Sequence, residues 1–540
     1  MRVASDPTAE RRELQSGNGG RNDVLISFSK LSRLSLVMLL GLSGTLFSTG
    51  PAIASTPIDV FDSADGLVAV ITDVTLNEDA ISDWLHAGPS ISDDGSTAIY
   101  SITRDDGESG RRVGHVYSVL LPDGEPVEIG ATIPDPQIDV SGDGTRVLLR
   151  TIGMNNSNIF VVGEGEQKKI VEEVGDTDLI DAVIAGDGSR VYFSLRRDTQ
   201  LAGVDGTAQG GIWAINSDGS GLEPVLLLDD ARGHVGAAPT DVMYVDDALT
   251  LDTSHDGDRL VGTIRNVTTG ERFVIGIIEG SEFSSILHGP ADFVNRAAIS
   301  GDGSTVLVVA RPIAESTLPS EYHIISFDGG STSTLQAAPD IVGTVFDKGV
   351  TLNHDGSFAF LGKSGHVFRV SDGAVVSLLP NCLGFAQTGP ELTDATISAS
   401  FDRVVYLAPF SGGNRLALIE LMPDDVTGVS TAERVSVVPV EHAVSSRDPV
   451  EIMVEIRATA DTESCATVRR DGVRIAQSVD LNDDGRVRDS SANDGTYTGA
   501  LYLDAAPGPV TVRIAVETQA ADGRRTTWIK DLNGLFAIVP

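Results

Sequence analysis

One short pattern recurs along most of this 540-residue chain and constrains its fold more than any other feature. An Asp-Gly pair follows a β-branched residue and precedes an alternating apolar run, as in "ISGDGSTVLVV" from Ile299. Asp-Gly between two such runs is a hairpin signal, because Gly accepts a positive φ and Asp tolerates one. The copies begin at Ile91, Val140, Ile184, Thr253, Ile299 and Leu352, with a degenerate seventh at Ile397 in which Ser400-Phe401 replaces Asp-Gly.

The spacing of the copies predicts the architecture. The shared Gly recurs at intervals of 49, 44, 69, 46 and 53 residues. A repeat of roughly 40–50 residues with several short strands is typical of a β-propeller, one copy per blade. We therefore expect an all-β chain with seven blades, six and eight being the alternatives. The strand from Gly66, "GLVAVITDV", is expected to pair with that from Arg415, "RLALIEL", because ring closure removes exposed sheet edges.

The repeat also resembles a known family. The order Ile/Val-Ser-x-Asp-Gly, then an aromatic-rich strand and a second Asp-Gly turn, is similar to the WD-repeat-like blades of TolB-type propellers over residues 60–422. The resemblance implies a protein-interaction role in the cell envelope, but no partner contacts can be carried over onto residues of this chain. TolB-type blades usually carry Pro before the Asp, whereas this divergent chain has Asp93, Gly142, Gly186, His255, Gly301 and His354.

The longest interval between copies indicates where a ligand would be contacted. The extra residues of the 69-residue interval are expected in loops at Arg196–Gly210 and Asp229–Asp247. Long loops on a rigid ring commonly carry binding residues, which makes Arg196, Arg197 and Asp198 candidates for ligand contact. The alternative is a charged rim loop without a ligand.

The N-terminus has the composition of an export signal, predicted to span residues 1–54. Arg21, Lys30 and Arg33 precede the apolar stretch Leu34–Phe47, and Ala52-Ile53-Ala54 offers a small-x-small cleavage site. An uncleaved N-terminal anchor is the alternative. Cleavage would leave no membrane span and a periplasmic or extracellular protein.

The charge of the chain excludes some partners. The formal net charge is −38, and removal of residues 1–54, with six Lys/Arg and four Asp/Glu, changes it to −40. A surface of this kind repels nucleic acid and anionic membranes, so no nucleic-acid partner is expected.

Cys382 and Cys465 would form one disulfide or stay reduced, and the sequence leaves the two alternatives open.

A second domain is predicted after the repeat. A propeller over 55–422 would be followed by a polar linker at 423–433. From Arg434 to the C-terminus the strands alternate without the propeller period, over the length of an immunoglobulin-like β-sandwich. The segment "DDGRVRDSSANDGTY" is similar to a turn of secreted bacterial immunoglobulin-like domains.

The same segment carries the clearest metal motif. Asp480, Asn482 and Asp484 followed by Gly have the spacing of a calcium-binding loop, and Asp489 would add a ligand. The twelfth position is Ser491 instead of the usual bidentate acid. A loop that holds its own backbone amides is therefore the alternative to calcium, which is the one cofactor that the sequence offers.

No catalytic motif stands out. The chain contains no G-x-S-x-G, no H-E-x-x-H and no C-x-x-C. The sequence therefore favours an exported, non-enzymatic propeller that binds or scaffolds a protein partner. An enzyme acting on a polysaccharide or peptide in the central funnel is one alternative, and a calcium-stabilised adhesion or surface component is another.

The calcium loop gives a first testable prediction. Millimolar calcium should raise the melting temperature of the exported chain, since an ion bound only by the folded state stabilises it. Replacement of Asp484 by Asn should abolish that shift, and magnesium should not reproduce it. A melting temperature that is the same with and without calcium would contradict the calcium assignment.

Overall fold

The computed structural model describes most of the chain between Val68 and Val539, within the compact unit 54–540. The predicted signal segment lies outside the described residues. So do the following internal segments: 75–87, 107–110, 123, 133–135, 153–156, 164, 175–177, 247–250, 281–284, 292, 312–320, 330–331, 336–349, 362–364, 379–392, 411–412, 423–434, 440–442, 446–448, 457–461, 471–472, 475–478, 482–495, 503–507 and 520–524.

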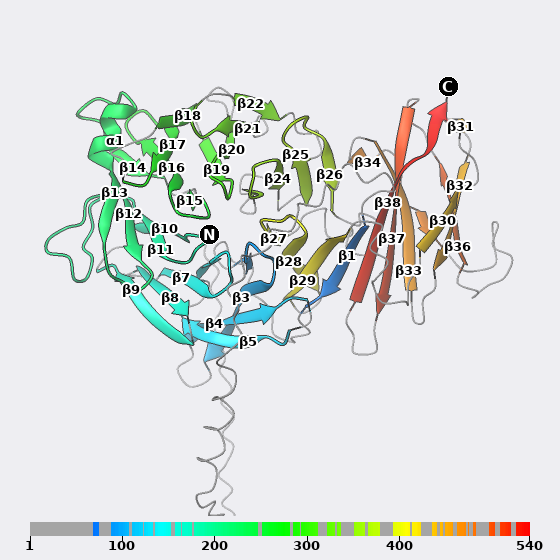
Figure 1. Ribbon diagram of the computed structural model, residues 1–540, viewed down its shortest axis with the longest axis horizontal. Helices are drawn as coiled ribbons and strands as arrows, with labels where there is room; N and C mark the ends of the chain where they lie inside the picture. Colours follow the sequence, from blue (N-terminus) through cyan, green and yellow to red (C-terminus); the bar gives the residue numbers. More distant parts are fainter. Residues whose placement is uncertain are drawn as a thin grey trace, which may run out of the picture. The chain divides into compact units, whose positions relative to one another are not determined.

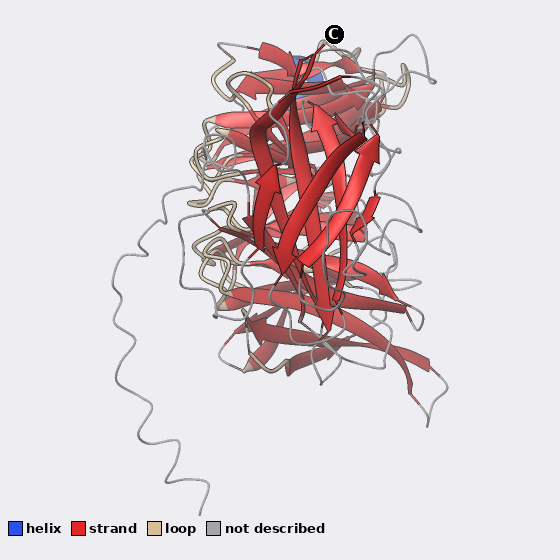
Figure 2. Ribbon diagram, turned by 90° about the vertical axis from the view of Figure 1, so that its right-hand side faces the viewer, coloured by secondary structure: helices blue, strands red, loops and turns tan. Residues whose placement is uncertain are grey.

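The fold is all-β: strands make up nearly all of the described secondary structure (Figure 2), and seven sheets are arranged in a ring as the blades of a propeller (Figure 1). The inner strands of the blades surround a central channel. Each blade is antiparallel, and its innermost strand lines the channel; in blade 4 that strand is β15 (Asp252–Thr253). Blades 1 to 3 consist of β2 (Ser90–Ile91), β3 (Thr97–Asp106), β4 (Arg111–Leu120), β5 (Val127–Thr132); β6 (Gln137–Val140), β7 (Arg146–Ile152), β8 (Ser157–Gly163), β9 (Glu166–Glu172); and β10 (Leu179–Ile184), β11 (Arg190–Leu195), β12 (Gly211–Asn216), β13 (Glu223–Leu227).

The remaining blades follow the same plan, so the predicted count of seven is confirmed. In blade 4 two short strands, β14 and β15, both pair with β16. Blades 4 to 6 consist of β14 (Met243–Val245), β15 (Asp252–Thr253), β16 (Arg259–Asn266), β17 (Arg272–Ile278), β18 (Ser285–Ala291); β19 (Phe293–Ile299), β20 (Thr305–Arg311), β21 (Glu321–Ser326), β22 (Thr332–Leu335); and β23 (Val350–Leu352), β24 (Phe358–Leu361), β25 (His366–Arg369), β26 (Val375–Ser377).

Blade 7 closes the ring with a strand from the other end of the repeat. It contains β27 (Thr393–Ile397), β28 (Arg403–Phe410) and β29 (Gly413–Met422), and its fourth strand is β1 (Val68–Asp73). The antiparallel register places Val68 opposite Met422 and Asp73 opposite Ala417. The pairing predicted from the sequence is therefore confirmed.

The C-terminal strands continue the sheet of blade 7. The second edge of β1 pairs with β38 (Arg525–Val539). That sheet then runs through β37 (Gly508–Gln519), β33 (Thr462–Arg470) and β34 (Val473–Arg474), with β31 (Ala443–Ser445) on β38 and β35 (Val479–Leu481) on β33. A separate sheet has the order β30 (Val435–Pro439), β32 (Pro449–Ile456), β36 (Thr496–Tyr502). The immunoglobulin-like class of this region stays a prediction.

The Asp-Gly segments are turns, as predicted. In blade 5, Ser300 Oγ donates to Asp302 Oδ1 at 2.6 Å and accepts from the Thr305 N–H at 3.0 Å. Gly303 follows with φ 71°. Blades 1, 2 and 4 repeat these contacts, and Asn353 replaces the Ser in blade 6. The buried hydroxyl thus uses both its donor and an acceptor, which offsets the cost of burying it.

The degenerate turn of blade 7 reaches the same geometry with different residues. Ser398 Oγ donates to Asp402 Oδ1 at 2.7 Å, so the carboxylate comes from one residue after the turn centre instead of one before it. Phe401 takes the position of Gly with φ 60°. Its ring is only 2% exposed and lies 6.2 Å from that of Phe358. Burial of a Phe side chain, worth about 1.5–3 kcal/mol, offsets the roughly 1–2 kcal/mol cost of a left-handed conformation.

One insertion differs from the sequence-based expectation. Arg196–Gly210 is a loop as predicted, with a bridge between Thr199 and Ala208. The second insertion, expected as a loop over Asp229–Asp247, instead contains α1 (Leu228–His234) and β14. The helix forms because Leu228 and Ala231 share one face and are both buried against the core between blades 3 and 4.

The hydrophobic core lies between neighbouring blades. Between blades 5 and 6, Leu307 and Tyr322 pack with Val350 and Phe368, and the rings of Tyr322 and Phe368 stack at 6.3 Å. Similar clusters occupy the other blade interfaces. Because the apolar side chains are used between the sheets, the inner strands can present polar groups to the channel.

The turn geometry predicts two unequal glycine substitutions. In Gly303→Ala two sources of strain combine. The alanine would have to adopt the left-handed φ of 71°, and its Cβ would lie 2.7 Å from Arg259 Cδ. Gly329→Ala has a similar φ, 76°, with open space around the Cβ. We expect G329A to cost about 1 kcal/mol and G303A about 2 kcal/mol or more in chemical denaturation. Equal losses would show that the Arg259 side chain does not restrict a Cβ at position 303.

Candidate functional site

The residues before each turn Asp form one mouth of the channel, which we call the rim. A closed circle of backbone hydrogen bonds joins each rim segment to the next, and all seven blades take part. The N–H donors and carbonyl acceptors are Asp94 to Gly142 (3.4 Å), Gly142 to Gly186 (2.7 Å), Asp187 to His255 (3.0 Å), His255 to Gly301 (2.8 Å), Asp302 to His354 (2.7 Å), His354 to Ala399 (3.2 Å) and Ala399 to Asp93 (3.0 Å).

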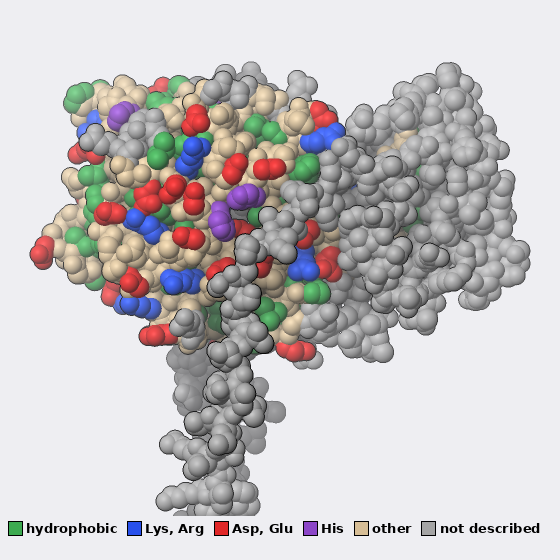
Figure 3. Space-filling model, viewed as in Figure 1, with side chains coloured by type: hydrophobic (Ala, Val, Ile, Leu, Met, Phe, Trp, Pro, Cys, Tyr) green, Lys and Arg blue, Asp and Glu red, His purple; other side chains and the backbone are tan. Residues whose placement is uncertain are grey.

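Three polar side chains converge on this rim. His255 Nδ1 of blade 4 lies 2.5 Å from Asp93 Oδ2 of blade 1, and both side chains are 43% exposed. The hydrogen bond with Asp93 raises the pKa of His255. The ring of His354, from blade 6, lies edge-on to that of His255 with 6.1 Å between centroids. Figure 3 shows histidine side chains near the middle of this face, with acidic side chains around them.

Glycine at the neighbouring rim positions makes this convergence sterically feasible. A Cβ at Gly186 would lie 2.2 Å from His255 Nδ1, and one at Gly142 would lie 2.3 Å from Asp93 Oδ2. A Cβ at Gly301 would lie 2.4 Å from Nδ1 of His354. The rim positions of blades 2, 3 and 5 therefore carry no side chain, and the polar side chains of blades 1, 4 and 6 occupy the space above them.

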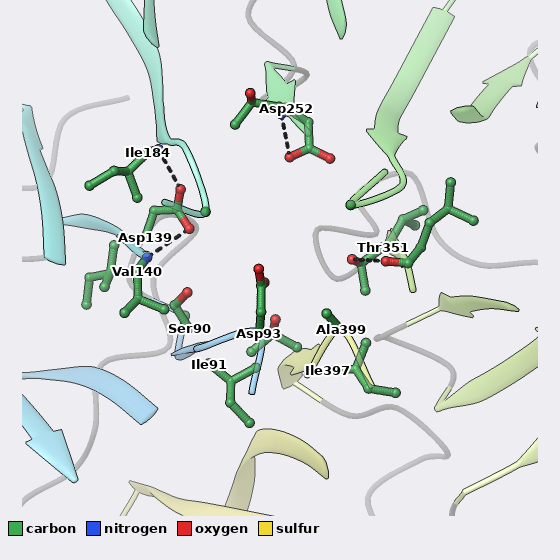
Figure 4. A pocket seen from close by; sticks show the side chains of 18 of the residues that line it. Ser90, Ile91, Asp93, Asp139, Val140, Ile184, Asp252, Thr351, Ile397 and Ala399 are labelled. Carbon is green, nitrogen blue, oxygen red and sulfur yellow. Dashed lines mark hydrogen bonds between the residues drawn. The ribbon is translucent and has the colours of Figure 1, made fainter. Parts of the chain in front are cut away.

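A polar cavity of about 270 Å³ lies beneath the rim. Its wall comes from the inner strands, and Figure 4 shows Asp93, Asp139, Asp252 and Thr351 around it. Arg296 adds a positive charge to the lining and lowers the pKa of Asp252 against the effect of burial.

The channel carboxylates hold neighbouring blades together. Asp139 accepts the N–H of Val140 and that of Ile184 in the next blade, both at 2.9 Å. Asp252 accepts the N–H of Thr253 at 3.0 Å and that of Ile299 in the next blade at 2.9 Å. Burial raises the pKa of Asp139 to about 7 and that of Asp252 to about 6. Each carboxylate is thus a structural clamp that titrates near neutral pH.

A third carboxylate, on Asp181, also accepts a backbone N–H of the next blade. Asp181 accepts the N–H of Leu251 in the next blade at 3.0 Å, and Gln137 Nε2 donates to its other oxygen at 2.7 Å. The buried Arg150 donates to Gln137 Oε1 at 2.9 Å and to Leu179 O, and burial lowers its pKa to about 10. The hydrogen bonds of the buried Arg150 guanidinium are thus made to residues below the rim and not to the rim side chains.

The residues chosen from the long loop lie elsewhere. Arg196, Arg197 and Asp198 follow the end of β11 that is distant from the Asp-Gly turn, so they belong to the opposite face of the ring. Arg197 Nε pairs with the buried Asp178 at 2.7 Å, and Asp198 Oδ1 accepts the Gly210 N–H at 2.9 Å. Their role in ligand contact stays a prediction.

Three of the four predicted calcium ligands lie outside the described residues. Asp480 lies on β35, whereas Asn482, Asp484 and Asp489 fall outside the described residues, as does Cys382. Among the residues that are described, no group of three or more His, Cys, Asp and Glu is arranged to hold a metal ion.

The described part of the chain also contains no helix long and apolar enough to cross a membrane.

Sequence reasoning missed the rim as a site. Asp93, His255 and His354 were noted only as departures from the usual Pro before the turn Asp. The available signal was that large polar residues alternate with Gly at one repeat position. Asp139 and Asp252 share another position, two residues before Ser141 and Ser254, which alignment of the repeats would have exposed.

The sheet topology defines a seven-bladed β-propeller with a polar channel. No protein-family model matches the chain, and no curated protein matches it. Among solved structures it is similar to acylaminoacyl peptidase of Pyrococcus horikoshii, with 14% identity, TM-score 0.41 and coverage of 70% of this chain and 59% of that one.

Two further likenesses are of the same order. Kuenenia stuttgartiensis hydrazine synthase has 15% identity and TM-score 0.38, with coverage of 62% of this chain and 96% of that one. TolB of Acinetobacter baumannii has 12% identity and TM-score 0.29, with coverage of 50% and 64%. The blade count accordingly follows from the strand pairing and not from these likenesses.

The carboxylate clamp predicts an unusual pH dependence. The folded pKa of Asp139, about 7, exceeds the ordinary value of 3.8, so the folded chain binds the extra proton between these values and stability falls as pH rises from 4 to 7. Asn mimics the protonated carboxyl. Asp139→Asn should match the wild type near pH 4 and flatten this fall, by on the order of 4 kcal/mol at pH 7.

The measurement is urea denaturation across this pH range. Asp205→Asn, at an exposed position of the Arg196–Gly210 loop, serves as the control and should reproduce the wild-type profile. A profile of D139N parallel to that of the wild type would show that the clamp does not titrate in this range.

Proposed function

We propose that the protein is an exported, non-enzymatic propeller that binds a partner protein, in the cell envelope or outside the cell, through the rim. The resemblance of its repeats to TolB-type blades implies a role of this kind. In this proposal the C-terminal strands form an immunoglobulin-like domain that serves as a spacer or adhesion module.

The convergence of Asp93, His255 and His354 carries the proposal. An exposed ion pair contributes about 1 kcal/mol or less to stability, so the Asp93–His255 pair is poorly explained as a stabilising device. The backbone circle already joins the blades at this height. Exposed charged and aromatic groups held on a rigid ring are suited to binding a partner instead.

The enzyme alternative has one specific observation in its favour. The raised pKa values of Asp139 and Asp252 resemble those of catalytic acids, and such an enzyme would act on a polysaccharide or peptide in the channel. Both oxygens of each carboxylate, however, accept backbone N–H groups. Proton exchange with a substrate would have to break a contact between blades, which favours the structural role.

Site-specific photo-crosslinking tests the binding proposal. A benzoyl-phenylalanine at Ala399, a rim position, should capture a partner in cells that export the protein. The same amino acid at Asp205, on a loop of the opposite face, is the matched control. Combining the Ala399 probe with His255→Ala and Asp93→Ala should reduce the captured species several-fold. Capture from Asp205 alone, or capture unaffected by both substitutions, would contradict binding at the rim.

A further inference from the structure

The Asp93–His255 pair has the geometry of an oriented metal ligand. A histidine that binds a metal through one ring nitrogen normally donates the other N–H to a carboxylate, a backbone carbonyl or a water, which fixes the tautomer and the ring direction. Asp93 Oδ2 is the acceptor for His255 Nδ1 at 2.5 Å. Within the described residues the hydrogen bond of the His255 ring is made by Nδ1, which leaves Nε2 available to coordinate.

A second imidazole stands at a suitable distance. The ring centroids of His255 and His354 are 6.1 Å apart and the planes meet at 80°. Zinc–nitrogen bonds of about 2.0–2.1 Å place the ring centres of two imidazoles on one ion roughly 5–6.5 Å apart. The spacing of the two rings therefore lies within the range that one ion can bridge.

The surroundings favour a cation over a bound anion. Besides Asp93, the carboxylates of Asp187 and Asp256 act electrostatically on His255. Carboxylates grouped at a concave mouth raise the local concentration of cations. Imidazole nitrogens select zinc, copper(II) and nickel, whereas calcium and magnesium prefer a shell of oxygen atoms.

We propose that His255 and His354 bind a divalent transition-metal ion at the rim, with Asp93 as the positioning residue for His255. Two protein ligands leave coordination positions on the ion open. This inference rests on the proposed function in one respect: a donor group of the partner would fill an open position and make the ion part of the interface.

Calorimetric titration of the untagged exported chain with zinc chloride tests the proposal. We expect one zinc per chain, and a loss of affinity of about tenfold or more in both His255→Ala and His354→Ala. Asp93→Asn should weaken binding by about 10-fold, as removal of an outer-shell partner does elsewhere. Nickel should compete, and calcium should not.

A second pair of histidines provides the matched control. His288 and His323 stack at 4.5 Å between blades 4 and 5, away from the rim. His323→Ala should retain zinc binding, and far-ultraviolet circular dichroism should confirm that every variant is folded. Loss of binding in H323A but not in H354A would overturn the assignment, as would absence of zinc binding by the wild type.

The two proposals can fail separately. Zinc binding that depends on His255 and His354, without any partner captured from Ala399, would support the metal site and contradict the binding function. A partner captured from Ala399 by a wild type that binds no zinc would do the reverse. Capture that depends on zinc and is abolished by chelation would support the ion as part of the interface.

Discussion

The circle of backbone hydrogen bonds at the rim is the interaction on which the rest of the site depends. Each bond joins one blade to the next without the participation of a side chain. One level below, Asp139, Asp181 and Asp252 each accept an N–H of the following blade. Blades 2 to 5 are thus held at two heights and the whole ring at one, so side chains that project from the rim meet in a defined geometry.

Because backbone hydrogen bonds join the blades, the rim side chains are not needed to hold the ring together. Seven equivalent turns would permit seven equivalent residues, yet three rim positions are polar and the others are Gly or Ala. His255 reaches from blade 4 to Asp93 on blade 1, and it can do so only because Gly142 and Gly186 stand between them. The large and the small residues are therefore required together, which argues that the polar group was selected for its surface chemistry.

The fold could be predicted from the sequence because its signals are local. Each Asp-Gly turn is fixed by residues within a few positions, and even Phe401 fits once Asp402 supplies the carboxylate. The rim site could not be predicted in the same way. His255 and Asp93 are 162 residues apart and meet only because ring closure brings blades 1 and 4 to one mouth. The α1 helix escaped notice since it is one short element with no side-chain N-cap.

Blade 7 differs from the others in how it must assemble. Blades 1 to 6 are each built from consecutive strands, whereas blade 7 combines β27–β29 with β1, and β38 extends the same sheet. Contacts between such distant segments form late, because the loop entropy of joining them must be met first. Ile71, Ile419 and Ile529 lie in one apolar cluster, so the C-terminal strands help to bury the strand that closes the ring. A partner that engages the C-terminal strands would therefore also act on the stability of the propeller.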